Sequence, residues 1–185
     1  MFKYSSWILA GLIVLALSML SCKLISVDQQ AVNVAVTIEQ TFNVHPPNQT
    51  SSSTTINTAD YWPDGFDGWS IDTADLTDLQ FSVSDVSTQE RAVSASFKVE
   101  FRTLPSGTVQ EIGHTQTATL GEILDTPMDV WNSKVTINAA GKTALLNAVA
   151  LKQSIELIGT TLNASGEADF NCIATIKVQL SLKKN

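Results

Sequence analysis

The residues most able to do chemistry lie in one stretch, between positions 60 and 78. Its aspartates are Asp60, Asp64, Asp67, Asp72, Asp75 and Asp78. No Lys or Arg lies among them, so the carboxylates repel one another, and a bound cation would relieve that repulsion. Ca²⁺ takes about six to eight oxygen ligands, which carboxylates and the backbone carbonyls of a glycine-containing loop supply. Asp60, Asp64, Asp67 and Asp72 are therefore candidate calcium ligands, although their spacing fits no known calcium loop.

Four aromatic residues accompany these aspartates: Tyr61, Trp62, Phe66 and Trp69. An exposed aromatic ring packs against the apolar face of a sugar or peptide, while nearby carboxylates accept hydrogen bonds. This combination predicts a carbohydrate- or protein-binding site around Trp62 and Trp69. The alternative is that both tryptophans turn inward and close one end of the fold. A third hypothesis is an enzyme that uses two of the carboxylates as acid and base, but no single pair stands out.

The remaining reactive side chains form no recognisable catalytic or metal-binding motif. Cys172 lies on the apolar side of an alternating segment, which predicts a buried and unreactive thiol. His45 and His114 have no Cys, His or Glu at the spacing of a zinc site. The Gly-Lys-Thr triplet at 141–143 resembles the end of a phosphate-binding loop, but the glycine that should precede it is missing. The sequence therefore predicts no catalysis, and no cofactor other than calcium.

Alternation of apolar and polar residues predicts about seven β-strands, because successive side chains of a strand face opposite sides. The clearest segments are 31–44, 93–101 and 170–183, and the others are 79–83, 108–120, 130–137 and 154–162. In the 130–137 segment, Trp131, Val135 and Ile137 fall on the same side of the strand. Strands with one apolar side are typical of antiparallel sheets that have one solvated face.

Two segments interrupt the strands. Residues 138–153 are rich in helix formers, and Asn138 is a suitable N-cap, so we expect a short helix across one end of the β structure. Residues 46–78 are expected to form one long acidic and aromatic loop. The resulting fold class is mostly β: a two-sheet antiparallel β-sandwich of the immunoglobulin-like class with one short crossover helix. A small β-barrel is the alternative.

The N-terminus has the organisation of a targeting segment. Residues 1–6 carry one positive charge, and residues 7–20 form an apolar run without any charge, WILAGLIVLALSML. This order is typical of a secretory signal peptide. As a helix, the apolar run spans about 21 Å, which is short of the ~30 Å hydrocarbon core of a bilayer. We therefore predict a signal peptide over residues 1–21, with an uncleaved membrane anchor as the alternative.

The end of this segment resembles the lipobox of bacterial lipoproteins, in which a Leu, a small residue and a Gly, Ala or Ser precede a lipidated Cys. The matching residues are Met19-Leu20-Ser21-Cys22, where Ser21 and Cys22 fit the pattern and Leu20 is larger than usual. The resemblance implies a diacylglycerol thioether and an N-acyl chain, such as palmitate, on Cys22. It also implies the outer membrane rather than the inner one, because Lys23 stands where an inner-membrane protein has Asp. Ordinary cleavage that leaves Cys22 as a free thiol is the alternative.

The composition excludes other classes of protein. The chain has 185 residues, of which 18 are acidic and 11 are Lys or Arg, and its net charge of -7 does not suit nucleic-acid binding. A lipid-anchor linker over residues 22–30 and a single domain over 31–185 fit this length. The sequence thus predicts a lipid-anchored cell-envelope protein with a structural or interaction role, and an envelope protein or a glycan as its partner. A calcium-stabilised binding module is the alternative.

Overall fold

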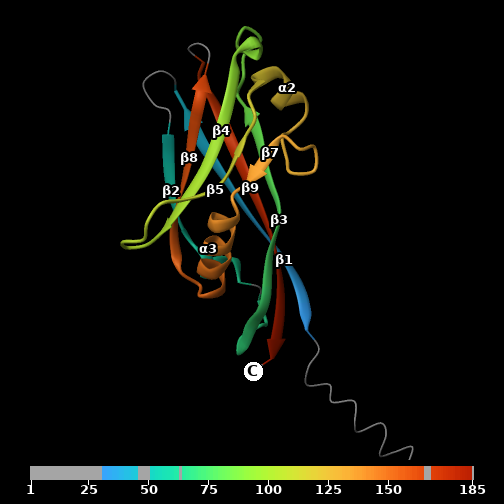
Figure 1. The fold of residues 1–185 in the computed structure, drawn as a ribbon, viewed down its shortest axis with the longest axis vertical. Helices are drawn as coiled ribbons and strands as arrows, with labels where there is room; N and C mark the ends of the chain where they lie inside the picture. Colours follow the sequence, from blue (N-terminus) through green and yellow to red (C-terminus); the bar gives the residue numbers. More distant parts are fainter. Residues whose placement is uncertain (1–30, 46–50, 63, 165–167, 185) are drawn as a thin grey trace, which may run out of the picture.

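Strands from both halves of the chain stack as two antiparallel sheets (Figure 1). The computed structural model describes residues 31–45, 51–62, 64–164 and 168–184. The smaller sheet has the order β1-β9-β3, with β1 at Val32–Val44, β9 at Phe170–Lys184 and β3 at Trp69–Ser84. The larger sheet has the order β2-β8-β4-β5-β7, and the short strand β6 at Ala118–Thr119 also pairs with β4. The bounds of its main strands are Ser51–Asn57 for β2, Ser154–Ala164 for β8, Ser94–Thr103 for β4, Gln110–Thr115 for β5 and Val135–Ile137 for β7. The predicted two-sheet sandwich is confirmed, and in the described residues the sheets do not close into a barrel.

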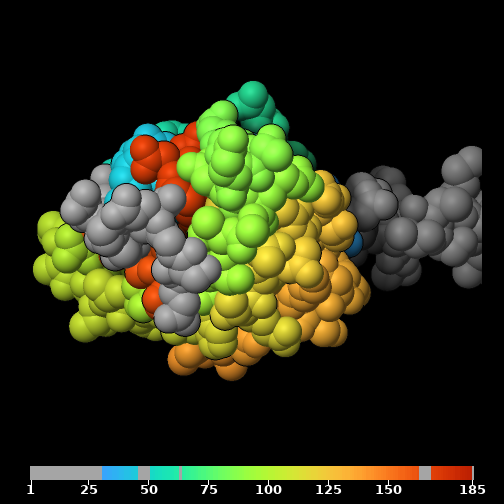
Figure 2. Space-filling model, turned by 90° about the horizontal axis from the view of Figure 1, so that it is seen from above, coloured from blue at the N-terminus to red at the C-terminus, as the bar shows by residue number. Residues whose placement is uncertain are grey.

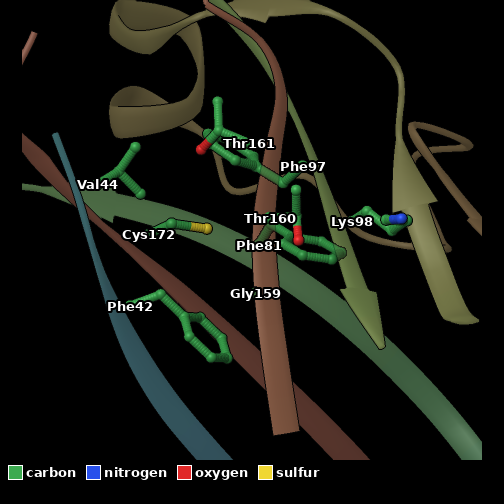
Figure 3. A pocket seen from close by; sticks show the side chains of 9 residues that line it. All are labelled: Phe42, Val44, Phe81, Phe97, Lys98, Gly159, Thr160, Thr161 and Cys172. Carbon is green, nitrogen blue, oxygen red and sulfur yellow. The ribbon is translucent and has the colours of Figure 1, made fainter. Parts of the chain in front are cut away.

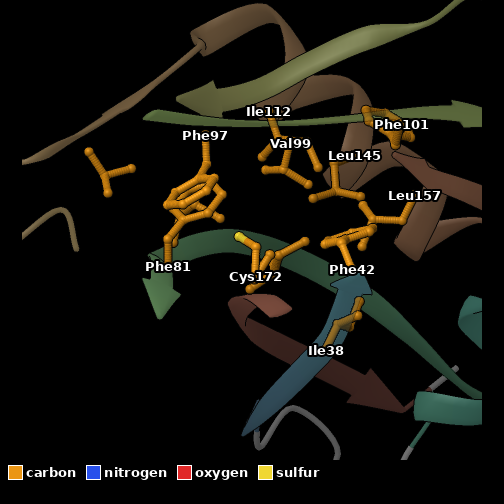
Figure 4. Packing of buried hydrophobic residues seen from close by; sticks show 14 of the residues in the cluster. Ile38, Phe42, Phe81, Phe97, Val99, Phe101, Ile112, Leu145, Leu157 and Cys172 are labelled. Atoms are coloured by element: carbon orange, nitrogen blue, oxygen red, sulfur yellow. The ribbon is translucent and has the colours of Figure 1, made fainter. Parts of the chain in front are cut away.

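The long strands send every second residue into one shared core, as their alternation predicted. From β9 these residues are Phe170, Cys172, Ala174, Ile176, Val178, Leu180 and Leu182. The larger sheet contributes Phe97, whose ring centroid lies 6.2 Å from that of Phe81 and 5.9 Å from that of Phe170. Figure 4 shows Phe81, Phe97 and Cys172 among the apolar side chains that fill the space between the sheets. Burial of one apolar face per strand therefore holds the two layers together.

The predicted helix is present as α3, which spans Ala139–Ala150. Asn138 is its N-cap, because its Oδ1 atom accepts hydrogen bonds from the backbone N–H groups of Ala140 and Gly141 at 3.0 and 3.2 Å. The helix packs against β5 and β3, so it closes the side of the sandwich rather than one end. Gly141 permits this approach, since a Cβ atom there would run into the backbone carbonyl of Glu111.

The prediction of one long loop over residues 46–78 is wrong for most of that stretch. It contains β2, the 3-10 helix η2 at Thr58–Tyr61, and the beginning of β3. The sequence does not predict β2, because Ile56 is its only large apolar residue and the strand shows no alternation of apolar and polar residues. The predicted strand at 79–83 is the second half of β3, and the first half was not predicted because the register of β3 against β9 shifts between Ile71 and Thr73 and again between Leu76 and Asp78. Each bulge inserts one residue and breaks the period of two.

The predicted strand over 108–120 is also shorter than expected. β5 pairs antiparallel with β4, but the chain then forms α2 at Leu120–Asp125. Thr119 and Glu122 make a capping box: the Thr119 hydroxyl accepts from the Glu122 N–H at 3.2 Å, and the Glu122 carboxylate accepts from the Thr119 N–H at 2.9 Å. The Thr119 N–H and the Thr119 hydroxyl both donate to the Glu122 carboxylate, and these two hydrogen bonds hold the pKa of Glu122 below its usual value. The Thr-x-x-Glu spacing was visible in the sequence.

The strand register defines two ends of the sandwich. Val32 of β1 pairs with Leu182 of β9, which pairs with Ile71 of β3, and we call this the near end. Val44 pairs with Phe170 at the opposite end, which we call the far end. In Figure 1 the near end lies at the bottom, beside the C-terminus, and α2 lies at the top.

Candidate functional site

The four predicted ligand-binding rings lie at the near end and turn toward the core. Tyr61, Trp62, Phe66 and Trp69 are all half-buried and packed against the hydrophobic cluster. Phe66 meets Trp69 edge-to-face with ring centroids 5.1 Å apart, and the Trp62 Nε1 atom donates to the Phe66 carbonyl at 3.4 Å. The ammonium group of Lys152 lies 3.6 Å from the centre of the Trp62 ring. These rings close the near end of the sandwich, while ligand binding by them stays a prediction.

Several aspartates of the same segment are paired with lysines that lie far away in the sequence. Asp72 contacts Lys183 at 3.0 Å, Asp75 contacts Lys142 at 2.6 Å, and Asp78 contacts Lys177 at 3.0 Å. The antiparallel pairing of β3 with β9, together with the packing of α3 on β3, brings these opposite charges together. For these three of the six aspartates, the protein's own lysines relieve the repulsion that suggested a cation.

The four candidate calcium ligands do not converge. Asp72 is paired with Lys183, Asp60 accepts a hydrogen bond from the Asn57 amide at 2.9 Å, and Asp64 and Asp67 are exposed. Throughout the described parts of the chain, no three side chains of His, Cys, Asp or Glu are grouped as a metal site requires. Calcium binding by these residues therefore remains a prediction from the sequence alone.

Asp78 is the one aspartate of this segment with a buried side chain. Only 8% of the side chain is exposed, whereas its partner Lys177 is 46% exposed. Its Oδ2 atom accepts from the Lys177 ammonium, and its Oδ1 atom has no hydrogen-bond partner. Because one of its oxygens is unsatisfied, the charged Asp78 carboxylate is stabilised in its buried position mainly by its single cationic partner.

Cys172 is buried in the core, as its place in the alternation predicted. Burial raises its pKa strongly, and the thiolate is the reactive form, so the folded protein keeps this sulfur inert. Figure 3 shows Cys172 beside Phe42, Phe81 and Phe97, in the narrow apolar space between the sheets.

One aromatic residue does present its ring to solvent, and sequence reasoning assigned it to a strand. Trp131 is 78% exposed and lies in a turn that precedes β7. Asp129 and Asn132 hold the turn, because the Asn132 N–H donates to the Asp129 carboxylate at 2.7 Å and the Asp129 N–H donates to the Asn132 side chain at 3.1 Å. Paired Asp and Asn side chains three residues apart are a turn signal that was readable in the sequence.

A polar hollow lies at the far end, where β1 ends and β9 begins. Its volume is about 230 Å³, and we call it the far-end hollow. The residues that line it are Asn43, His45, Asp85, Asp169, Phe170 and Asn171. The His45 Nδ1 atom lies 3.1 Å from a carboxylate oxygen of Asp169, and the Asn171 amide donates to the Asp85 carboxylate. Sequence reasoning missed this group because its members come from three separate segments.

The far end also holds a charged contact between two connections. Figure 2 looks down on this end, where the β3–β4 connection and residues 120–135 lie side by side. The short 3-10 helix η3 at Glu90–Ala92 meets α2 there, and Arg91 donates to both carboxylate oxygens of Asp125 at 2.7 Å. This contact fixes α2 against the strand ends.

The predicted lipidation site, Cys22, lies outside the described residues, as does the apolar run before it. In the ranges that the structure describes, none of the helices is long and apolar enough to cross a bilayer.

Comparisons with known proteins identify no family. No family model matches the chain, and no curated protein matches it. Among solved structures, it is similar to a chain of Desmodium yellow mottle tymovirus at 9% identity, over 82% of this chain and 88% of that one, with a TM-score of 0.33. A nora virus chain has 12% identity, coverage of 82% and 69%, and a TM-score of 0.35. The BFDV capsid protein has 10% identity, coverage of 82% and 99%, and a TM-score of 0.32. These TM-scores are too low to carry an argument about fold or function.

Proposed function

We propose that this chain is a lipid-anchored protein of the bacterial cell envelope, with a structural or interaction role and no catalytic one. The sequence feature behind the proposal is the lipobox-like ending, Ser21-Cys22, after an apolar run. The observation that supports it best is the direction of the chain. β1 begins at Val32, ten positions after Cys22, so an anchor on Cys22 would attach the sandwich through its near end.

The short separation between Cys22 and Val32 limits how far the sandwich stands from the membrane. Ten steps of an extended chain span at most about 35 Å. With the anchor in place, the near end faces the anchoring bilayer and the far end points away from it. The Trp131 turn and the far-end hollow would then be available to other envelope components.

The anchor itself supplies the membrane affinity. Each buried methylene contributes about 0.8 kcal/mol, so two or three acyl chains hold a protein stably where one chain does not. Lys23 follows the cysteine, and under the lipoprotein sorting rule this favours the outer membrane. The proposal thus places the chain in the cell envelope and, in a cell with two membranes, on the outer one.

A cysteine comparison tests this proposal. The Cys22→Ser protein should leave the membrane fraction, as a precursor or as a soluble form, and its intact mass should lack acyl chains. The matched control is Cys172→Ala, which removes the buried thiol and should leave fractionation and acylation unchanged. Both variants should keep a β-sheet circular dichroism spectrum. Membrane retention of Cys22→Ser, or a wild-type mass without acyl groups, would refute the anchor.

A further inference from the structure

The near half of β3 and the helix α3 form the two walls of a groove, which we call the α3–β3 groove. Its volume is about 380 Å³. Figure 1 shows α3 beside the lower half of β3. The β3 wall is the stretch 71–74, and the α3 wall consists of Thr143, Leu146, Asn147 and Ala150. These helix positions are three or four residues apart or differ by one, so they lie on one face of α3.

β3 is an edge strand of the smaller sheet, and its open edge differs between its far and near halves. In the far half, the Phe81 N–H donates to the Met128 carbonyl at 2.7 Å, and the Met128 N–H donates to the Phe81 carbonyl at 2.9 Å. In the near half, residues 71–74 have no backbone hydrogen bond to any described segment other than β9. An edge strand presents a row of unpaired N–H and C=O groups, and here that row borders the α3–β3 groove.

The lining of the groove suits the side chains of an added strand. Ile71, Ala74 and Leu146 are half-buried, and Ala150 is exposed. Because successive side chains of a strand face opposite sides, every second side chain of a strand paired to residues 71–74 would pack against this apolar surface. Residues 71–74 extend over about 10 Å at a rise of about 3.3 Å per residue, so about four residues of an added strand pair here.

The β3 side of the groove has an excess of carboxylates. Asp72 lies in the groove wall and Asp75 follows it, and each contacts a lysine. Asp64 and Asp67 precede β3 and are exposed, and neither forms a salt bridge with a described residue. A partner that complements this surface therefore carries positive charge.

We propose that the α3–β3 groove binds an extended, basic peptide segment of another envelope protein, which adds as a strand to the open edge of β3. The backbone of the segment pairs with residues 71–74, its alternate apolar side chains pack on Ile71 and Leu146, and its Lys or Arg side chains lie beside Asp67 and Asp72. An acyl chain fits less well, because it has no group that could hydrogen-bond the N–H and C=O groups of the edge. The proposal rests on the interaction role proposed above and names the class of partner, but it does not depend on the anchor.

Two matched peptides test the backbone pairing. The first has lysine at both ends and alternating valine and threonine between them, and the second has the same side chains with every central amide nitrogen methylated. The full-length protein in detergent micelles is titrated with each peptide and followed by NMR of its backbone amides. The first peptide should shift the amide signals of residues 71–74 and of Leu146, and added salt should weaken its binding. The second should bind about tenfold more weakly or not at all, because methylation removes the N–H donors.

One substitution at two positions of α3 locates the binding site. Ala150→Arg places a long cationic side chain in the groove, so it should weaken binding of the first peptide by about tenfold. The matched control is Ala140→Arg, on the same helix but outside the groove lining, which should bind like the wild type. Both positions are exposed, so both variants should keep the dispersed spectrum of the folded protein.

Three results would overturn the proposal: equal binding of the methylated peptide, equal weakening by Ala140→Arg, or amide shifts confined to β1, the other edge strand of the smaller sheet. If deleting residues 23–30 speeds hydrogen exchange at the amides of residues 71–74 in the absence of peptide, the chain itself fills the groove, which also contradicts the proposal. Micelles hold the protein whether or not Cys22 is acylated, so failure here and failure of the Cys22 experiment are separate outcomes.

Discussion

The segment from Tyr61 to Asp78 and the turn from Asp129 to Lys134 behave in opposite ways. The first carries the densest set of aromatic and acidic residues in the chain, yet its rings pack against the core and three of its aspartates bind lysines. The second was assigned to a strand, yet it presents Trp131 to solvent. Residue type alone therefore did not decide which aromatic surface is available to a partner.

The physical difference between the two regions lies in what surrounds each ring. In the near-end segment, Phe66 and Trp69 cover each other in an edge-to-face contact, and the Lys152 ammonium covers the Trp62 ring. In the turn, the polar groups of Asp129 and Asn132 hydrogen-bond to each other's backbone N–H groups and fix the backbone, while Trp131 remains 78% exposed. A rigid turn with an exposed indole loses little entropy on binding, which is a property of interaction surfaces.

Truncating one tryptophan in each region should give the largest contrast. Trp69→Ala removes a half-buried ring and its contact with Phe66, so we expect the free energy of unfolding to fall by about 2–3 kcal/mol. Trp131→Ala should change it by no more than about 0.5 kcal/mol, because an exposed side chain loses little on truncation. Urea unfolding followed by circular dichroism measures both. Equal losses in the two variants would contradict the contrast.

The aspartate–lysine pairs of the near-end segment should differ from one another. Lys177→Ala leaves the Asp78 carboxylate buried without its cation, and we expect a loss of about 1–3 kcal/mol in unfolding free energy. Lys183→Ala removes a partner of the exposed Asp72 and should cost less than about 0.5 kcal/mol. The same urea experiment compares them. The double variant, Asp78→Ala combined with Lys177→Ala, is the control. If it is no more stable than Lys177→Ala alone, the unpaired Asp78 carboxylate is not the cause of the loss in unfolding free energy.

The smallest effect concerns α2, the helix that leads to the Trp131 turn. Hydrogen bonds from the Thr119 N–H and hydroxyl hold the pKa of Glu122 below its ordinary value. The ionised carboxylate therefore stabilises the fold at pH values above that ordinary pKa. This contribution is lost as the pH falls through the lower pKa of the folded state. NMR titration of the Glu122 side chain should show the lowered pKa. Thr119→Val removes the hydroxyl and should raise that pKa toward the ordinary value, although the Thr119 N–H remains. An unchanged pKa would show that the hydroxyl plays no part.

The parts of the fold that the sequence predicted rest on local periodicity. β1, β4 and β9 each have a period of two over ten or more residues, so the side that is buried follows from the order of residues alone. Asn138 as a cap is equally local, because the donors that it satisfies lie two and three residues away. Cys172 was placed correctly by the same alternation.

The remaining features depend on contacts between distant segments. The bulges of β3 can be recognised only in its register with β9, and the Asp78 carboxylate is paired with Lys177, a residue 99 positions later. The far-end hollow likewise exists only where the ends of β1, β3 and β9 meet. The sequence by itself determined the alternating strands and the helix. Tertiary structure alone decided which rings are covered, which carboxylates are paired with lysines and where the far-end hollow forms, because cross-strand register brings together residues that no local pattern relates.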